Sequence, residues 1–337
     1  MSYLWNYLIN CLGSFGCGRS AKWVAVAAFS ATLVACGGGG GGGSGSGAPT
    51  PPSIPIGITA ANAESVGTTA LMGALGLSES GTLVGVDTSI DTSVPPRTIS
   101  RISAGAAKHA RAFLGSPQSL AGVVQTIPCG VSGDVTVNAA DDGTSITITF
   151  NACSDFAGEM INGSVSMTGI TGTATAFSGT FSSNLTISVT GFSDFSLVGS
   201  YSISFTYSGF DWTSTVSGSS FSITVGSSSA TLSSFIFSDS YDNVTQIYST
   251  SGNYTIASTD IGGSVTVQTN TPIQQYAYRV RPFAGQITVT GTGNSRVRVT
   301  ILGDETNAGN DVRFEIDENG DSAYETTIER DWSALPI

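Results

Sequence analysis

The stretch Tyr201-Ser202-Ile203-Ser204-Phe205-Thr206-Tyr207 alternates strictly between large apolar side chains and hydroxyl side chains. Successive side chains of a β-strand point to opposite faces of the sheet, so this stretch predicts a strand with one apolar and one hydroxyl face. The same alternation recurs at 146–150, 185–189, 221–225 and 265–267. Clusters of Gly, Asn, Asp or Ser separate such segments at intervals of roughly 8–15 residues, which is typical of antiparallel hairpins.

No long helical pattern interrupts residues 129–270, which excludes a parallel sheet built from strand–helix–strand units. The chain is therefore predicted to be mainly β, with a large antiparallel meander of about 14 strands. Such a sheet must bury its apolar face, so we expect either a rolled sheet or a sandwich. A transmembrane β-barrel has the same alternation and is a further alternative. The short, uneven strands and the absence of an aromatic residue at the end of the chain disfavour the barrel.

The solvent-facing side of the predicted sheet is unusually rich in hydroxyl groups and poor in charged groups. Ser and Thr make up 43 of the 100 residues from 161 to 260, and no Lys or Arg occurs between Arg111 and Arg279. The whole chain has 12 Lys and Arg against 24 Asp and Glu, which excludes a basic nucleic-acid-binding protein. Because His109 is the single histidine, chemistry that depends on histidine is nearly excluded as well.

The N-terminal residues predict export from the cytoplasm. Residues 1–35 contain Arg19, Lys22 and no acid, and the apolar stretch 23–34 is shorter than the ~20 residues that a membrane-spanning helix needs. A basic region followed by a short apolar region is typical of a signal peptide. The stretch Leu33-Val34-Ala35-Cys36 resembles the lipobox of bacterial lipoproteins. The resemblance implies cleavage after Ala35, a diacylglyceryl group on the Cys36 thiol and acylation of the new amine.

Residues 36–56 would then join this lipid anchor to the folded part of the chain. They include Gly37 to Gly43 without interruption and a Pro-rich end, a composition typical of a flexible tether. Gly37, rather than Asp, follows the modified cysteine, and by resemblance to lipoprotein sorting in enterobacteria this favours the outer membrane. Loss of residues 1–35 removes two bases and no acid, so the net charge goes from −12 to −14.

Two cysteines remain in the mature chain beyond the anchor. Cys129 and Cys153 are an even pair in an oxidising compartment, so we expect a disulfide between them. Their spacing does not match a redox motif, and two cysteines with one histidine are too few for a zinc site.

Residues 57–126 differ from the period-two region 127–337, which we take as the antiparallel β domain. They predict two short helices, at 58–75 and 98–114, that pack on the sheet. The second carries Arg101, Lys108 and Arg111 near one face. This basic face would either meet anionic lipid head groups or be a solvated face that complements an acidic body.

The best candidate for a metal site is an acidic stretch near the C-terminus. Asp317, Asn319, Asp321 and Glu325 offer oxygen ligands around Gly320, as Ca²⁺ prefers. Their spacing resembles the start of an EF-hand loop, but the glycine stands at position four and Ile328 takes the place of the twelfth-position glutamate. A hairpin turn between strands 311–317 and 323–330 explains the stretch equally well, as a turn also explains Asp141-Asp142-Gly143.

The other charges of residues 271–337 fit cross-strand ion pairs. The predicted participants are Arg296, Arg298 and Arg313 on one side and Glu315, Glu325 and Glu329 on the other. No nucleophile elbow, phosphate loop or zinc-protease motif is present, so we expect no enzymatic activity. Trp212 is either a sugar-stacking side chain on the hydroxyl face or a core residue.

Two functional classes follow from this reading. The first is a membrane-anchored, non-enzymatic structural or binding module of the cell envelope, on its periplasmic or external side, with a glycan or protein partner. The second is a carrier of an apolar or lipid ligand inside a rolled sheet. A carrier predicts an open apolar cavity rimmed by residues such as Phe205, Tyr207 and Phe221, whereas a module predicts a filled core.

Overall fold

The structure is a computed structural model. It describes residues 50–82, 122, 124–142, 144–154, 159–173, 175–189, 194–225, 228–277, 279, 281–303 and 311–335. The candidate anchor Cys36, the cleavage site after Ala35 and the predicted helix at 98–114 with its basic face lie outside the described residues.

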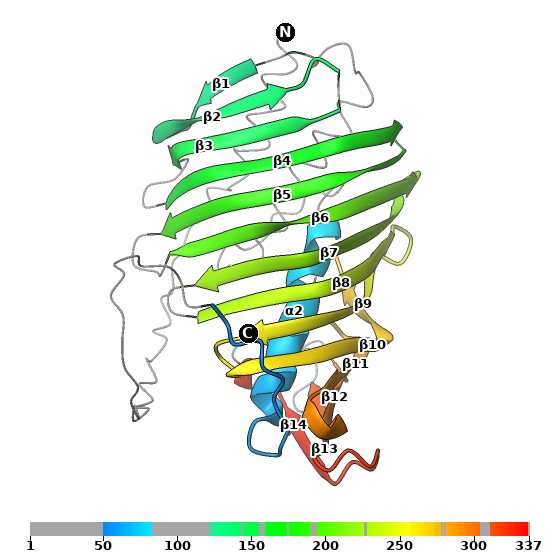
Figure 1. Cartoon of the computed structure of the whole chain (residues 1–337). Helices are drawn as coiled ribbons and strands as arrows, with labels where there is room; N and C mark the ends of the chain where they lie inside the picture. Colours follow the sequence, from blue (N-terminus) through cyan, green and yellow to red (C-terminus); the bar gives the residue numbers. More distant parts are fainter. Residues whose placement is uncertain are drawn as a thin grey trace, which may run out of the picture.

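The described strands form one antiparallel sheet in which each strand pairs with the next along the chain (Figure 1). The strands are β1 (Val124–Pro128), β2 (Ser132–Ala139), β3 (Ile146–Ser154), β4 (Glu159–Thr173), β5 (Ala176–Val189), β6 (Phe195–Ser208), β7 (Asp211–Val225), β8 (Ser228–Asp242), β9 (Ile247–Ser258), β10 (Gly263–Tyr276), β11 (Ala284–Thr290), β12 (Arg296–Ile301), β13 (Val312–Asp317) and β14 (Thr326–Arg330). Within the described chain, β1 pairs only with β2 and β14 only with β13, so the sheet is open. The predicted meander of about 14 strands is confirmed.

Of the two expected arrangements, the described strands adopt the rolled sheet. Figure 1 shows the sheet twisting along its length and curling from β10 to β14 around the helix α2 (Ala63–Thr82). This helix contacts β8 and β9 on one side and β11, β12 and β13 on the other. The curl therefore buries the apolar face of the C-terminal half of the sheet against a helix rather than against a second sheet.

Helix α2 begins five residues later than the predicted helix at 58–75, because the chain before it is extended. The Ile56 N–H donates to the carbonyl of Ser264 at 3.1 Å, and the Ser264 N–H donates back to the carbonyl of Ile54 at 3.0 Å. The Ile58 N–H donates to the Ser295 hydroxyl at 2.8 Å. These hydrogen bonds tie residues 54–58 to the sheet, so that their backbone cannot be helical.

One face of α2 is fully buried. Its buried apolar residues recur at helical spacing and are Ala63, Val66, Ala70, Leu71 and Ala74. The Tyr254 hydroxyl donates to the carbonyl of Ala70. A Cβ on Gly67 would lie 2.8 Å from the ring of Phe314 and 2.9 Å from Val299, so the glycine lets the helix approach β12 and β13 closely.

The described helices are this 20-residue α-helix and two short 3-10 helices, η2 (Thr292–Asn294) and η3 (Trp332–Ala334). Of the two predicted helices, the first corresponds to α2, which starts later and ends later than the predicted 58–75, and the second, at 98–114, lies outside the described residues. No described helix has both the length and the apolar character that are needed to cross a bilayer.

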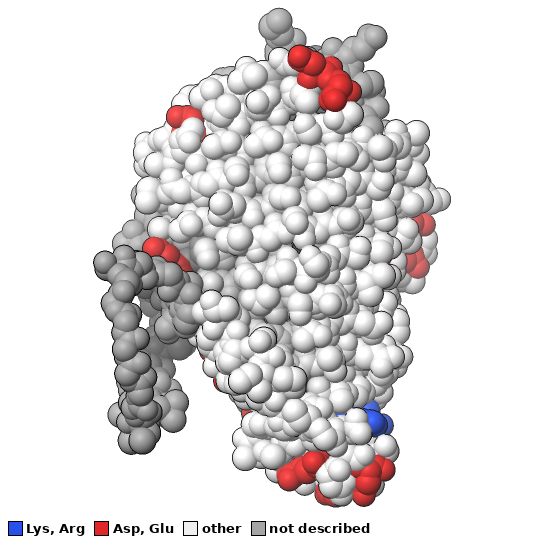
Figure 2. Space-filling model, in the orientation of Figure 1, with Lys and Arg blue, Asp and Glu red and all other residues white. Residues whose placement is uncertain are grey.

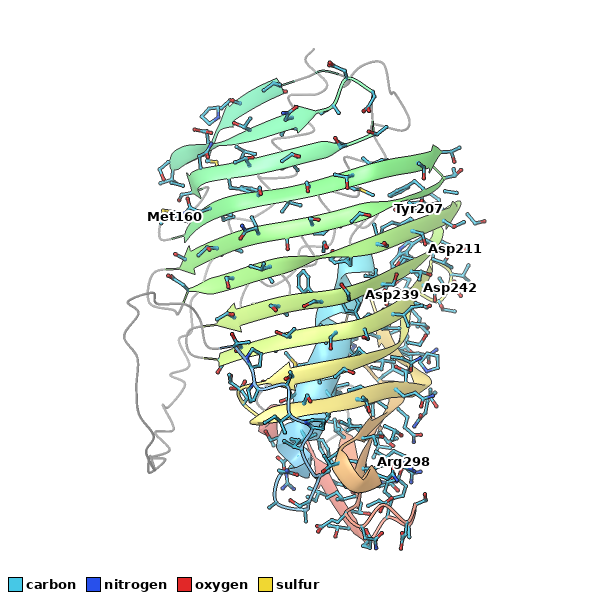
Figure 3. All side chains as sticks on the ribbon, viewed as in Figure 1. Met160, Tyr207, Asp211, Asp239, Asp242 and Arg298 are labelled. Carbon is cyan, nitrogen blue, oxygen red and sulfur yellow. A yellow bond between two sulfur atoms is a disulfide. The ribbon has the colours of Figure 1, made fainter. Side chains whose placement is uncertain are left out.

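The alternation that opened the sequence analysis is confirmed on β6. Tyr201, Ile203, Phe205 and Tyr207 are all buried, and the hydroxyl residues between them are exposed. Aromatic rings of neighbouring strands stack along this inner face, for example Phe181 on Tyr201 with ring centroids 4.9 Å apart. Figure 3 shows the short side chains of the opposite, outer face.

Candidate binding surfaces

The outer face of β4 to β10 carries almost no charge. Residues 160–278 include five acids and no base, namely Asp194, Asp211, Asp239, Asp242 and Asp260. Four of the five lie in turns or at strand ends, and Asp239 is buried on the inner face. Figure 2 accordingly shows a broad white surface with acidic groups at its margins and basic groups near its lower end. Attraction between opposite charges cannot hold a ligand on such a surface.

Hydroxyl groups form straight rows across this outer face. Thr180, Ser202 and Ser217 are consecutive cross-strand partners on β5, β6 and β7. A second row, two residues further along each strand, consists of Ser178, Ser204 and Thr215. Neighbouring strands lie ~4.8 Å apart and alternate residues of one strand ~6.7 Å apart, so these side chains form a regular two-dimensional array.

A hollow of about 320 Å³ lies between the two rows. The backbone of Gly179 and Ile203 lies between the rows, and Gly169 of β4 lines one end of the hollow. A Cβ on Gly169 would meet no atom within 4 Å, so the hollow is open on this side. The hollow is thus a trough across the strands, with hydroxyl groups on both walls.

A second hollow, of about 410 Å³, lies further along the same face, across β8 to β11. Its polar lining combines hydroxyl and amide side chains. They are Ser234, Asn253, Thr255, Thr266, Gln268, Thr288 and Thr290. Thr266 is the cross-strand partner of Thr290, and Gln268 is the partner of Thr288, so this hollow too lies between ordered rows.

The acidic stretch near the C-terminus is the turn between β13 and β14. The oxygens of Asp317, Asp321 and Glu325 that would bind a cation lie within 4.8 Å of one another. Asp317 is fully buried, and its two carboxylate oxygens accept the N–H groups of Gly320 at 2.7 Å and Ser322 at 2.9 Å. These hydrogen bonds make the buried carboxylate a stabilising element of the turn.

The remaining ligand candidates of this turn are used in the same way. The Asn319 amide donates to Glu325 Oε1 at 2.8 Å, and Asn319 Oδ1 accepts the N–H of Asp321 at 2.8 Å. Asp321 Oδ1 in turn accepts the Ala323 N–H at 2.8 Å. The local hydrogen bonds explain the acidic cluster as a turn, and its three carboxylates supply fewer than the 6–8 oxygen ligands that a calcium ion takes.

Calorimetric titration with CaCl₂ distinguishes the two interpretations of this turn. We expect no binding heat and a change in melting temperature below about 1 °C, because three carboxylates are too few ligands for Ca²⁺. Saturable heat that the substitution Asp321→Asn abolishes would instead establish a calcium site.

A polar row crosses the otherwise apolar inner face. Ser214 of β7, Asp239 of β8 and Thr250 of β9 are consecutive cross-strand partners, and all three are buried. The Thr250 hydroxyl donates to Asp239 Oδ1 at 2.8 Å. Within the described chain, Asp239 Oδ2 and the Ser214 hydroxyl have no hydrogen-bond partner. Figure 3 shows Asp239 on β8, just before Asp242 at the end of the strand.

Burial determines the protonation state of Asp239, the acid in this row. It raises the pKa of Asp239 from 3.8 to about 8, and the hydrogen bond from the Thr250 hydroxyl opposes the shift only in part. The carboxyl is therefore mostly neutral at pH 7 in the folded protein. The sequence analysis missed this residue. Its signal was the alternation Phe235, Phe237, Asp239, Tyr241, which places an acid in phase with core aromatics.

Trp212 lies on the inner face and is 3% exposed. Its ring packs against Phe205 and Tyr248, with centroids 6.2 and 6.3 Å apart. Of the two interpretations of Trp212, the core interpretation is therefore right and the sugar-stacking interpretation is wrong. The exposed aromatic at this end of the sheet is Phe210, in the turn between β6 and β7.

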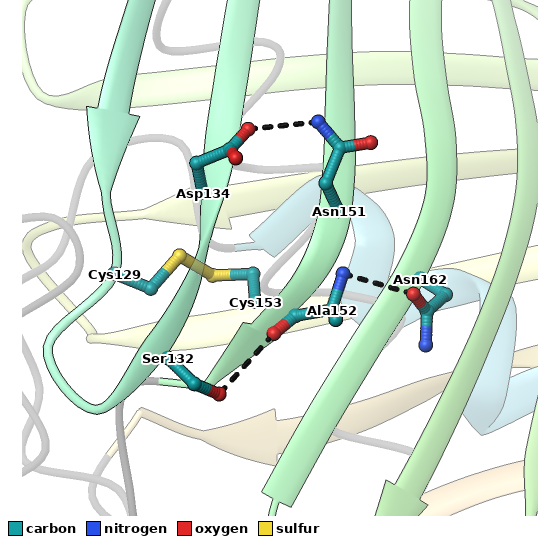
Figure 4. The surroundings of a disulfide bond; sticks show 7 residues. All are labelled: Cys129, Ser132, Asp134, Asn151, Ala152, Cys153 and Asn162. Atoms are coloured by element: carbon teal, nitrogen blue, oxygen red, sulfur yellow. Dashed lines mark hydrogen bonds between the residues drawn. A yellow bond between two sulfur atoms is a disulfide. The ribbon is translucent and has the colours of Figure 1, made fainter.

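The predicted disulfide is present. Cys129, which follows β1, is bonded to Cys153 of β3 across the intervening strand β2, with 5.6 Å between their Cα atoms. Figure 4 shows the hydrogen bonds around it, from the Asn151 amide to Asp134 and from the Ala152 N–H to Asn162. The bond thus fixes the edge of the sheet where β1 has a neighbour on one side only.

The double substitution Cys129→Ser and Cys153→Ser is expected to lower the free energy of unfolding by about 3 kcal/mol, since the cysteines are 24 residues apart in sequence. Chemical denaturation of the two proteins measures the loss. Reductant should lower the midpoint of the wild type to that of the variant and leave the variant unchanged. Equal midpoints of the two oxidised proteins would contradict the structural role of the bond.

The predicted cross-strand ion pairs form in part. Arg298 binds Glu315 through two hydrogen bonds of 2.6 and 2.8 Å, and Arg313 binds Glu329 at 2.8 Å. The hydrogen bonds and charge of Arg298 lower the pKa of Glu315. Arg296 instead donates to the Ser322 hydroxyl at 3.3 Å.

Searches of protein-family models, curated proteins and solved structures found no match to this chain.

Proposed function

We propose that this protein is a lipid-anchored, non-enzymatic binding module of the bacterial cell envelope, which presents the outer hydroxyl face of its sheet to a partner. The observation that carries the proposal is the uncharged outer face of the sheet (Figure 2). On this face, ordered cross-strand rows of Ser and Thr line one shallow hollow, and hydroxyl and amide side chains line a second. The lipobox-like stretch and the glycine-rich tether supply the anchor. Anchoring by two or three acyl chains is stable where a single chain is reversible.

The packing of the inner face favours a module over a carrier. Phe205, Tyr207 and Phe221, the residues that would rim an apolar cavity, are all buried in one continuous hydrophobic core. The two hollows described above lie on the outer face and are lined mainly by polar side chains. A continuous hydrophobic core at these positions supports a structural role for the inner face of the sheet.

Cell fractionation tests the anchor. We expect the wild-type protein in the outer-membrane fraction and the Cys36→Ala variant outside it, because the variant lacks the thiol that takes the diacylglyceryl group. Cys17→Ala is the matched control and should fractionate like the wild type, since residue 17 would leave with the signal peptide. A Cys36→Ala variant that stays in the membrane at the wild-type level would contradict the proposed anchor.

Lipid analysis separates the module from the carrier. Protein extracted in mild detergent should yield the covalent acyl chains only after chemical cleavage, and no stoichiometric free lipid. A free lipid species that co-purifies with Cys36→Ala in a fixed ratio would favour the carrier and overturn the module.

A further inference from the structure

We propose that the outer hydroxyl face binds an extended, uncharged polysaccharide, which lies across the strands in the trough between the two hydroxyl rows of β5 to β7. This inference names the partner class of the proposed function and rests on it. The trough is defined by Thr180, Ser202 and Ser217 on one wall and by Ser178, Ser204 and Thr215 on the other.

The lack of charged side chains on this surface favours a neutral ligand. No charged side chain lines either hollow, so a charged group of a ligand would lose hydration without gaining a counter-charge. The mature chain would carry a net charge of −14 and repel anionic polymers at long range. Acidic polysaccharides and nucleic acids are therefore poor partners.

The residue types favour a carbohydrate over a protein. Protein interfaces are enriched in aromatic residues, Met and Arg and depleted in Ser, whereas both trough walls consist of Ser and Thr. A hydroxyl group both donates and accepts hydrogen bonds and rotates to suit its partner. It therefore matches the hydroxyl and ether oxygens of a sugar in several orientations.

The repeat of the surface favours a polymer. Each of the strands β5, β6 and β7 adds one hydroxyl to each wall at ~4.8 Å intervals, which is close to the length of one hexose unit in an extended chain. Successive sugar rings along the trough would thus meet equivalent pairs of hydroxyls on β5, β6 and β7. The second hollow, across β8 to β11, offers hydroxyl and amide groups to another segment of polysaccharide. Each contact is weak in water, and affinity comes from their number.

A pull-down assay with insoluble cellulose and chitin, which are both neutral and β-linked, tests the inference. The assay measures how much of the full-length, detergent-purified protein each polysaccharide removes from solution. We expect binding to at least one of them. Because an unpaired charge in the trough would be desolvated by the ligand, Ser202→Glu should weaken binding by about tenfold or more. Thr186→Glu is the matched control: it places the same charge on the exposed face of β5, outside both hollows, and should change binding less than about twofold.

Ser202→Ala provides a second variant without a new charge. It removes one hydroxyl and should weaken binding by a few-fold at unchanged melting temperature. Failure of both polysaccharides to deplete the wild type would overturn the inference. Equal loss in Ser202→Glu and Thr186→Glu would overturn it too, since the trough would then have no special part. In either case the fractionation of Cys36→Ala still reports independently on the anchored module.

Discussion

Replacement of Asp239 by Asn is expected to stabilise the fold at pH 7, by about 4 kcal/mol at most because the buried amide N–H₂ offsets part of the gain. The pKa of this carboxyl is about 8 in the folded protein, against an ordinary value of 3.8. Between these values the folded state holds a proton that the unfolded chain has released, so stability falls as pH rises, by ~1.4 kcal/mol per pH unit. Asn keeps the oxygen that accepts from Thr250 and has no carboxyl proton to take up.

Chemical denaturation at several pH values between 5 and 8 measures this effect. The free energy of unfolding of the wild type should decline across the range, and that of Asp239→Asn should be nearly flat. Glu315 does not interfere, because a carboxyl with a lowered pKa loses its stabilisation only as pH falls below its ordinary 4.5. Asp242→Asn is the matched control: Asp242 is exposed, hydrogen bonds from backbone N–H groups lower its pKa, and Asn caps such a turn about as well.

A flat pH profile of the wild type, together with no gain in Asp239→Asn, would contradict the burial of a neutral carboxyl. Such a result would mean that water reaches the inner face around β7 to β9. The packed core would then no longer favour a module over a carrier.

Phe314→Ala is expected to lower the free energy of unfolding by about 3–5 kcal/mol. Phe314 is 0% exposed and lies where α2 comes closest to β13, against Gly67. Truncation would remove its apolar contacts and leave a cavity between helix and sheet. Phe210→Ala is the matched control, because Phe210 is 81% exposed and should contribute less than about 0.5 kcal/mol.

A double-mutant cycle with Gly67→Leu tests whether the two residues share one space. Gly67→Leu alone should destabilise the fold, since its Cβ would meet the Phe314 ring at 2.8 Å. In the Phe314→Ala background the leucine should recover part of the lost stability, with a coupling of about 1–3 kcal/mol. Additive losses in the double variant would mean that the leucine does not occupy the space left by the Phe314 ring.

Much of the sheet was predictable, because apolar and polar residues alternate with a period of two in the sequence. Segments such as 201–207 specify both the strand and the face that it buries, and the spacing of turns implied a meander. The form of the sheet was less predictable. That it rolls around α2 depends on Gly67 meeting Phe314, a contact between residues 247 positions apart in the chain. Local periodicity carries no signal for such a contact.

The candidate surfaces were predictable to different degrees. The hydroxyl face followed from composition, but its hollows depend on the register that aligns Thr180, Ser202 and Ser217. Trp212 could not be assigned, because it directly follows a turn where alternation restarts. Asp239 continues the alternation of buried aromatic residues on β8, so its burial could have been predicted from the sequence. It was missed because acidic residues in strands are normally exposed.

Mass spectrometry of the N-terminal peptide, taken from the membrane fraction of the cells that produce the protein, tests the proposed lipid anchor directly. We expect a chain that begins at Cys36, lacks residues 1–35 and carries the mass of a diacylglyceryl group on the thiol with a further acyl group on the amine. A mature protein that retains residues before Cys36, or that carries an unmodified Cys36, would contradict the claim that this sheet is held at the membrane by a lipid.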